Sequence, residues 1–353
     1  EMGDTSIGII ASGIAYQYAK EALPNASFLK LGMVNPLPQR LIESFAGKVK
    51  KLYVVEELEP VLEEQIKSWG IAITGKEIFP VQGELSANMI AEKIAGRAVD
   101  VRPAENLPPR PPVMCPGCPH RVIYYVMQKL RLHATGDIGC YTLGALPPLK
   151  AIDTCVCMGA SIGMAHGMEK ARGRDFSQRL VAVIGDSTFI HSGITGLIDV
   201  VYNRGASTVV ILDNSTTGMT GHQDHPGTGR TLKGEAVPPI NLVNLIRAIG
   251  IRHVRVVDPF ELEDVEKALR EETQREEPSV IIAQRPCALL SREVKAPVSI
   301  DEDICRHCGV CLHLGCPAIE KKIQGMHINH TLCNGCGLCL KVCKFGAIRR
   351  AGE

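Results

Sequence analysis

Residues 180–187 read LVAVIGDS, and residues 207–214 read STVVILDN. Each segment is a short apolar run, rich in β-branched residues, that ends in residues with oxygen-bearing side chains. Such runs are typical of parallel strands that are buried on both faces. We therefore expect strands over Leu180–Ile184 and Ser207–Leu212, and similar runs predict strands over Val254–Val257 and Val280–Ala283.

Helical patterns alternate with these strands, which predicts an α/β fold with a doubly wound parallel sheet. The expected helices are His120–Leu132, Ala160–Arg172, Gly193–Tyr202, Leu242–Ile249 and Glu261–Thr273. Residues 6–96 predict a second α/β layer by the same reasoning. Its expected strands are Ser6–Ser12, Phe28–Leu31 and Lys51–Val55, and its expected helices are Gly13–Leu23, Val61–Trp69 and Ala87–Ile94.

Five prolines between residues 101 and 112 predict an extended linker. The expected domains are therefore residues 1–100, the linker 101–112, residues 113–290 with the doubly wound sheet, and a C-terminal domain over residues 291–353.

The ends of the two central strands predict a site for magnesium and a diphosphate. Gly185 and Asp186 follow the first strand and Asn214 follows the second, and the carboxyl ends of parallel strands meet at one edge of a sheet. Asp186, Asn214 and the backbone carbonyl of Thr216 would give Mg²⁺ the oxygen ligands it prefers. The alternative is an ordinary strand–turn–helix in which Asp186 caps the helix.

This spacing is that of the thiamine diphosphate (ThDP) motif, with a serine in place of its last glycine. The residues expected to contact the cofactor are Gly185, Asp186, Ser187, Asn214, Thr216, Gly218 and, at the start of a predicted helix, His120.

Two cysteine quartets close the chain, and they repeat a C-x2-C-x2-C pattern followed by a fourth cysteine. They are Cys305, Cys308, Cys311 and Cys316, then Cys333, Cys336, Cys339 and Cys343. This is the spacing of a bacterial ferredoxin with two [4Fe-4S] clusters, in which the fourth cysteine of each run binds the other cluster. Zinc ribbons use paired rather than tripled cysteines, and disulfides would need an oxidising compartment. We therefore expect an α+β two-cluster ferredoxin domain.

The bulk composition excludes several functional classes. The net charge of the 353 residues is +1 and aromatic residues make up 4%, which gives no indication of nucleic-acid binding. The sequence contains no run of about 18 apolar residues, so no membrane span is predicted. Fourteen cysteines without a secretory signal predict metal chemistry in a reducing, anaerobic cytoplasm.

Four segments carry a resemblance to a known family. They are residues 114–121 (MCPGCPHR), 135–141 (TGDIGCY), 185–189 (GDSTF) and 219–229 (MTGHQDHPGTG). They resemble the indolepyruvate:ferredoxin oxidoreductase α subunits, within the 2-oxoacid:ferredoxin oxidoreductase superfamily, and the resemblance extends over nearly the whole chain. It implies that residues 1–100 form a transketolase C-terminal-like domain.

The resemblance also implies a third [4Fe-4S] cluster beside ThDP. The superfamily holds that cluster by a CPGC pair, a cysteine in a GIGC segment and a late PC segment. The matching residues here are Cys115, Cys118, Cys140 and Cys287, where Cys140 follows a strand expected to end at Gly139. The alternative is that these are reduced structural thiols.

Family members begin with a pyrimidine-binding domain, which carries the glutamate that protonates the cofactor's aminopyrimidine. We expect this domain to come from a separate chain or a segment outside this sequence, so that this chain alone is inactive. The other partners implied are a small second subunit in a hetero-oligomer, soluble ferredoxin, an aryl 2-oxoacid and coenzyme A.

The implied function is ThDP-dependent oxidative decarboxylation of an aryl 2-oxoacid to an acyl-CoA, with electrons passing through the clusters to ferredoxin. Two alternatives stay open: an electron-transfer subunit of another 2-oxoacid oxidoreductase, and a non-oxidative ThDP decarboxylase.

Several side chains are weaker candidates. His222 and His225, in the loop after Asn214, are candidates for acid–base catalysis or for binding the substrate carboxylate, and solvated loop histidines are the alternative. Cys155 and Cys157 could line the substrate pocket or simply pack. The remaining candidates are possible anion-binding arginines and histidines expected at the surface of the tail: Arg121, Arg230, His307, His313, His327 and His330.

Overall fold

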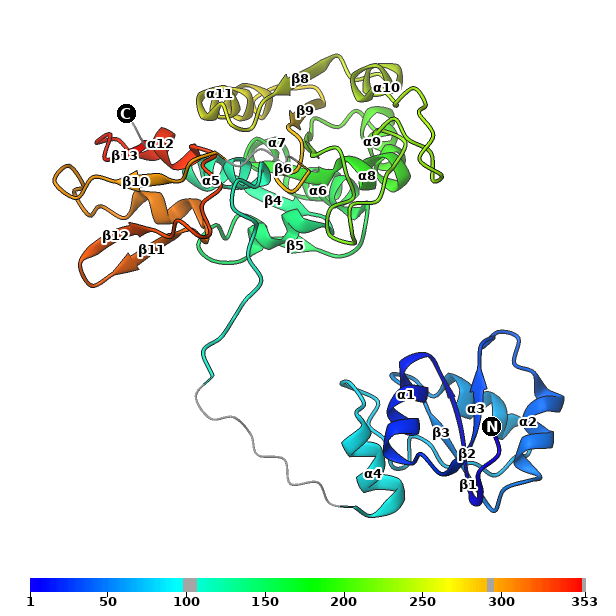
Figure 1. Cartoon of the computed structure of the whole chain (residues 1–353). Coiled ribbons are helices and arrows are strands. Elements are labelled where there is room, and N and C mark those ends of the chain that lie inside the picture. The colour runs from blue at the N-terminus through cyan, green and yellow to red at the C-terminus, as the bar shows by residue number, and fades with distance from the viewer. Residues whose placement is uncertain (98–106, 291–294, 351–353) are drawn as a thin grey trace. The chain divides into compact units, whose positions relative to one another are not determined.

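The computed structural model describes residues 1–97, 107–290 and 295–350, and the chain forms two compact units, Glu1–Pro109 and Arg110–Glu353 (Figure 1). Residues 101–106 of the predicted linker lie outside the described ranges, and so do residues 291–294 beside the predicted boundary at residue 290. The predicted domain limits therefore stay predictions.

The first unit is a three-stranded parallel sheet covered by helices on both faces. The order is β2-β1-β3, with β1 in the centre. Its elements are β1 (Asp4–Ser12), α1 (Gly13–Ala22), β2 (Ala26–Leu31), α2 (Gln39–Ala46), β3 (Lys51–Val55), α3 (Val61–Ser68) and α4 (Ala87–Ala95). Ile9 faces the side that α1 and α4 cover, and Ile10 faces the side that α2 and α3 cover. Helix α2 was not predicted from the sequence.

The second unit is built on a six-stranded, fully parallel sheet of order β5-β4-β6-β7-β9-β8. Its strands are β4 (His133–Gly136), β5 (Thr154–Cys155), β6 (Leu180–Gly185), β7 (Thr208–Asp213), β8 (His253–Val257) and β9 (Ser279–Gln284). The residues of β6 and β7 are all buried, as the unbroken apolar runs predict.

Helices cover both faces of this sheet, which confirms the doubly wound architecture. They are α5 (His120–Leu130), α6 (Ala160–Arg172), α7 (Arg174–Ser177), α8 (Asp186–Thr188), α9 (Ile194–Tyr202), α10 (Leu242–Ile249) and α11 (Leu262–Glu272), with short turns η1 (Cys140–Ala145) and η2 (Phe189–Gly193). Val181 and Val183 of β6 pack in one core with α5 and α11. Ala182 and Ile184 pack in a second core with α6, α9 and α10.

The C-terminal region has the α+β character expected for a ferredoxin-like fold. It contains β10 (Val298–Ile300), η3 (Val310–Leu314), β11 (Ile319–Lys322), β12 (Gly325–Ile328), α12 (Leu338–Val342) and β13 (Ile348–Arg350). Strand β10 pairs antiparallel with β13, and β11 with β12. Leu314, Ile328 and Leu338 lie in the same hydrophobic core as α5 and α11, so this region and the sheet share one core.

Several predicted element ends differ from the structure by one or more residues, and for the ends of β4 and α5 the local reason is clear. Strand β4 ends at Gly136 and not at Gly139, because Asp137 turns away to accept backbone hydrogen bonds from Gly159 and Ser161. Helix α5 ends at Leu130 and not at Leu132. Arg131 adopts a left-handed conformation with φ 55°, and the Leu132 amide bonds back to Met127.

Within the described part of the chain, none of the helices has the length and apolar character needed to span a bilayer.

Because the sheet and the C-terminal region share one core, we expect them to unfold together. Leu314 is 1% exposed, so Leu314→Ala should lower the free energy of unfolding by about 2–5 kcal/mol. The loss should appear at the same denaturant concentration in far-UV circular dichroism, which follows the sheet, and in the visible absorbance expected from the tail clusters. Leu332→Ala is the control, because Leu332 is 43% exposed. Separate transitions for the two signals would contradict a common core.

Candidate functional site

Four neighbouring strands of the six-stranded sheet deliver the candidate ligands to one edge. Strands β4, β6, β7 and β9 are adjacent and parallel, so their carboxyl ends lie together. The residues at or just beyond these ends are Asp137 and Cys140 after β4, Asp186 after β6, Asn214 after β7, and Cys287 after β9.

All seven residues expected to contact the cofactor line a single pocket at this edge, which we call the strand-end pocket. They are His120, Gly185, Asp186, Ser187, Asn214, Thr216 and Gly218. The pocket has a volume of about 540 Å³, including space that is open to solvent. Its lining also contains Cys140 and Tyr141 and the exposed apolar side chains of Ile138, Met158 and Met219.

The oxygen ligands in this pocket are buried and oriented by the backbone. Asp186 is 3% exposed and accepts hydrogen bonds from the amides of Ser187, at 2.8 Å, and Ser215, at 3.0 Å. Burial raises the pKa of Asp213, and the negative charge of Asp186 raises it further. Two buried carboxylates that repel each other would be relieved by a divalent cation. The donor set of Asp186, Asn214 and the Thr216 carbonyl therefore fits Mg²⁺.

His225 lies against the Asp186 carboxylate but does not line the strand-end pocket. Its Nδ1 accepts a hydrogen bond from the Gly227 amide, so a neutral ring carries its proton on Nε2. Nε2 is 3.3 Å from Asp186 Oδ2, within ion-pair distance, although the geometry is not that of a hydrogen bond. His225 lines a second pocket of about 750 Å³ together with Asp213 and Gln284. This position suits a residue that orients the carboxylate ligand.

The other two histidines near the site differ in environment. His222 is exposed, adopts a left-handed φ of 63°, and is not among the residues lining the strand-end pocket. The structure therefore does not bring His222 and His225 together there as a catalytic pair. His120 is buried edge-on against Tyr141, with ring centroids 5.9 Å apart. Burial lowers the pKa of His120 to about 4, with Asp186 opposing, so the imidazole is neutral at neutral pH.

Cys115, Cys118, Cys140 and Cys287, which we call the proximal quartet, gather beside the strand-end pocket. Burial raises the pKa of Cys118 to about 12, and the nearby Cys115 and Cys287 thiols also raise it. Burial raises the pKa of Cys140, and the same two thiols add to the shift. The Cys287 amide donates to the Asn214 carbonyl at 2.9 Å, which links this quartet directly to a magnesium-ligand candidate.

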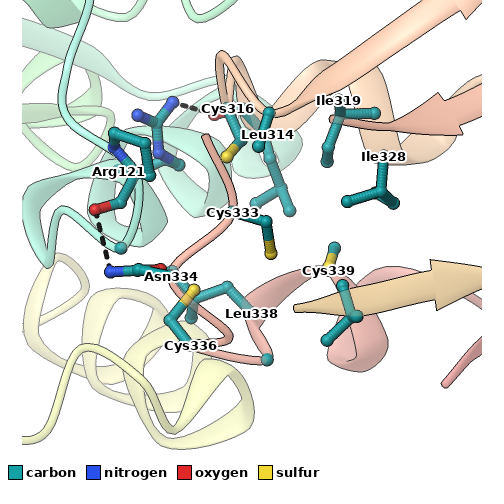
Figure 2. Close-up of a pocket in the computed structure, with 15 residues that line it drawn as sticks. Arg121, Leu314, Cys316, Ile319, Ile328, Cys333, Asn334, Cys336, Leu338 and Cys339 are labelled. Carbon is teal, nitrogen blue, oxygen red and sulfur yellow. Dashed lines mark hydrogen bonds between the residues drawn. The ribbon is translucent and has the colours of Figure 1, made fainter. Parts of the chain in front are cut away.

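The eight tail cysteines gather in the crossed pattern that their spacing predicts. Cys316, Cys333, Cys336 and Cys339, the middle quartet, line a pocket of about 400 Å³, and Figure 2 shows them around it. Cys305, Cys308, Cys311 and Cys343, the outer quartet, line another pocket of about 360 Å³. Burial raises the pKa of Cys339 to about 12, and Cys336, Cys316 and Cys333 raise it further.

In residues 1–97, 107–290 and 295–350, no three His, Cys, Asp or Glu side chains lie close enough to hold a single metal ion. The thiolates around a four-iron cubane lie farther apart than the thiolates around a single metal ion. A spacing too wide for one ion therefore remains compatible with a [4Fe-4S] cluster in each quartet.

Sequence reasoning missed two buried carboxylates and did not predict that Arg121 is buried. Asp137 is fully buried and binds the backbone at the start of α6, and Asp213 lies beside Asp186. The only signal for them was an acidic residue at the end of an apolar run. Arg121, a candidate anion binder, is 1% exposed and donates to backbone carbonyls.

The remaining weak candidates are exposed, and for the four tail histidines this confirms the prediction. They are Cys155, Cys157, Arg230, His307, His313, His327 and His330.

Residues 137–283 match the model of the thiamine pyrophosphate enzyme C-terminal TPP binding domain, and residues 326–349 match a 4Fe-4S binding domain. The chain is 39% identical to indolepyruvate oxidoreductase subunit IorA of Archaeoglobus fulgidus, over 99% of this chain and 60% of that protein. It is 38% identical to the subunit of the same name from Pyrococcus horikoshii, over 99% and 61%, respectively.

The resemblance inferred from the sequence is thus confirmed over nearly the whole chain. The chain spans about 60% of the length of these curated relatives.

The first prediction for this site concerns the carboxylate ligand. Asp186→Ala should abolish ThDP retention, because the side chain that would hold Mg²⁺ against the diphosphate is gone. The iron of the tail quartets should remain. Bound ThDP is measured by extraction and fluorescence, and iron by chelation. Asp264→Ala, at an exposed position on α11, is the control. A normal ThDP content in the Asp186 variant would show that the ligand is misassigned.

The second prediction separates the two loop histidines. His225→Gln should weaken Mg²⁺ affinity by about 10–100-fold, because the residue that orients Asp186 is changed. His222→Gln should leave the affinity unchanged, because His222 is exposed. The measurement is ThDP retention as a function of Mg²⁺ concentration. The opposite result for the two variants would refute the placement of His225.

Proposed function

We propose that the protein is the ThDP- and iron–sulfur-containing part of an oxidoreductase that acts on 2-oxoacids with ferredoxin as the electron acceptor. One observation carries the proposal: the strand-end pocket, the proximal quartet and the crossed tail quartets all lie within one compact unit. A decarboxylation that leaves two electrons on an organic cofactor needs an electron path of this kind.

ThDP, when bound, supplies an electron sink for the decarboxylation of a 2-oxoacid. Asp186, Asn214 and the Thr216 carbonyl would hold Mg²⁺ on the diphosphate. The neutral His120 ring would donate or accept a hydrogen bond with the cofactor. The apolar side chains of Met158 and Met219 would limit the access of water. The proximal quartet would hold the cluster that receives electrons first, and the tail quartets would hold the two that carry them to ferredoxin.

The finer part of the proposal concerns substrates. An aryl 2-oxoacid of the indolepyruvate type is supported by the relatives, which are named indolepyruvate oxidoreductase subunits. Coenzyme A as the acyl acceptor is implied by the family resemblance.

Partners follow from the same resemblance. We propose a hetero-oligomer with a small second subunit, and a pyrimidine-binding region outside residues 1–353 that completes the cofactor site. The exposed fractions of Ile138 (38%), Met158 (44%) and Met219 (51%) support a covering partner, since these three apolar side chains all line the strand-end pocket.

Two alternatives make different demands on the molecule. An electron-transfer subunit without ThDP chemistry would not need the buried pair Asp186 and Asp213. A non-oxidative decarboxylase would not need three cysteine quartets. Measuring bound ThDP and iron on the same sample separates the three cases.

An iron count tests the electron path. Anaerobically prepared protein should contain about twelve irons, four for each quartet. Cys287→Ser should remove up to about four of them and slow electron transfer to ferredoxin, while ThDP stays bound. A fully active preparation with about eight irons would contradict a cluster on the proximal quartet.

A reconstitution experiment tests the activity itself. The 353-residue chain alone should pass electrons through its clusters but should not turn over indolepyruvate or phenylpyruvate. Adding a polypeptide with the pyrimidine-binding domain, together with the small subunit, should restore CoA-dependent ferredoxin reduction. Turnover by the chain alone would contradict the proposed division of the cofactor site.

A further inference from the structure

Arg121 is a buried charge with no counter-charge among the described residues. It lies on α5 and is 1% exposed. Its Nη1 donates to the Leu314 carbonyl at 2.8 Å, and its Nη2 donates to the carbonyls of Met114, at 2.8 Å, and Cys115, at 3.0 Å. Its Nε is buried without a partner in the part of the chain that the structure describes. Burying an unpaired charge is costly, and an arginine does not relieve the cost by losing its proton.

The guanidinium lies where the proximal and middle quartets meet. Its acceptors come from both sides, since Cys115 belongs to the proximal quartet and Leu314 lies two residues before Cys316 of the middle quartet. Arg121 itself lines the pocket of the middle quartet (Figure 2).

The loops that carry the two quartets are in direct contact. Asn334 Nδ2 donates to the Pro116 carbonyl at 3.2 Å. Gly117, with a φ of 72°, packs so closely that a Cβ there would lie 2.3 Å from Asn334 Nδ2. A Cβ at Gly315, where φ is 65°, would lie 3.3 Å from Arg121 Nη1. The left-handed φ at both positions favours glycine, and the short distances show that little space separates the quartets at Arg121.

We propose that Arg121 is the counter-charge shared by the clusters of the proximal and middle quartets, and that it favours the reduced form of both. The proposal rests on the proposed function in one respect, which is that the quartets hold [4Fe-4S] clusters. A cluster with four thiolates is anionic and gains one further negative charge on reduction. A fixed cation in a poorly solvated site stabilises that extra charge.

The electron balance of the step is simple. With clusters on both quartets, one electron would leave the reduced cluster of the proximal quartet, which would become oxidised, and would enter the cluster of the middle quartet, which would become reduced. No bond or proton is exchanged. Because Arg121 lies between the two sites, it stabilises the electron on either side, and the electron does not lose this stabilisation on transfer.

The test is a redox titration of the anaerobically purified protein, followed by electron paramagnetic resonance. In Arg121→Gln, reduction of the proximal and middle clusters should become about tenfold less favourable, which is about 59 mV for a one-electron couple. The cluster of the outer quartet should keep its potential and serves as an internal control. Arg121→Lys keeps the charge and should stay close to the unmodified protein.

Three results would overturn the proposal. One is a Gln variant with full iron content and unchanged potentials. Another is an equal shift of all three clusters. The third is a Lys variant that shifts as far as the Gln variant, because the effect would then come from the lost carbonyl contacts and not from the charge.

If the Gln variant does not retain its iron, Asn334→Asp replaces it, because it adds a negative charge at the same contact. It should shift the same two potentials in the same direction, and unchanged potentials would overturn the proposal. If the unmodified protein holds no cluster on the proximal quartet, the proposed function fails in that respect. The comparison of the middle cluster with the outer cluster still decides the role of Arg121.

Discussion

The parallel direction of β4, β6, β7 and β9 is the constraint on which the rest of the site depends. Because these strands are adjacent and point the same way, the residues that follow them are brought to one edge although they are far apart in sequence. This topology is what brings together four residues of the candidate site: Cys140, Asp186, Asn214 and Cys287. The hydrogen bond from the Cys287 amide to the Asn214 carbonyl directly joins the segments that follow β9 and β7.

A second constraint is the core that the sheet shares with the ferredoxin-like region. Helix α5 starts beside the proximal quartet and packs on the sheet, and the same core contains Leu314 and Leu338 beside the middle quartet. A hydrophobic core is close-packed and does not deform easily. The cysteine quartets are therefore held at fixed separations, as electron transfer between them would need. A ferredoxin-like region on a flexible tether would not provide this.

The sequence predicted much of the fold, because buried parallel strands leave an unmistakable apolar run. Helix α6 was predicted at both ends, and β6 and β7 within one residue of their ends. Helix α2 was missed, since it lies in a short amphipathic stretch that follows two prolines. The predicted end of β4, at Gly139, lay beyond the observed end at Gly136. The strand stops early because Asp137 binds the start of α6, and that contact joins residues distant in sequence.

For the candidate site too, the sequence predicted the local features and missed those that depend on tertiary packing. Spacing alone predicted the crossed tail quartets, because ligands close in sequence are constrained by local geometry. It could not show that His225 lies behind Asp186 rather than in the strand-end pocket, or that Arg121 is buried between two quartets. Both facts arise from packing across the whole unit.

The central claim is that electrons released at the strand-end pocket enter the cysteine quartets. The most direct measurement mixes the assembled enzyme, with ThDP and Mg²⁺, with one 2-oxoacid in the absence of oxygen and ferredoxin, and follows the visible absorbance of the clusters. The account predicts that the absorbance bleaches in step with CO₂ release. Release of CO₂ without bleaching, in protein that holds its full iron, would contradict it.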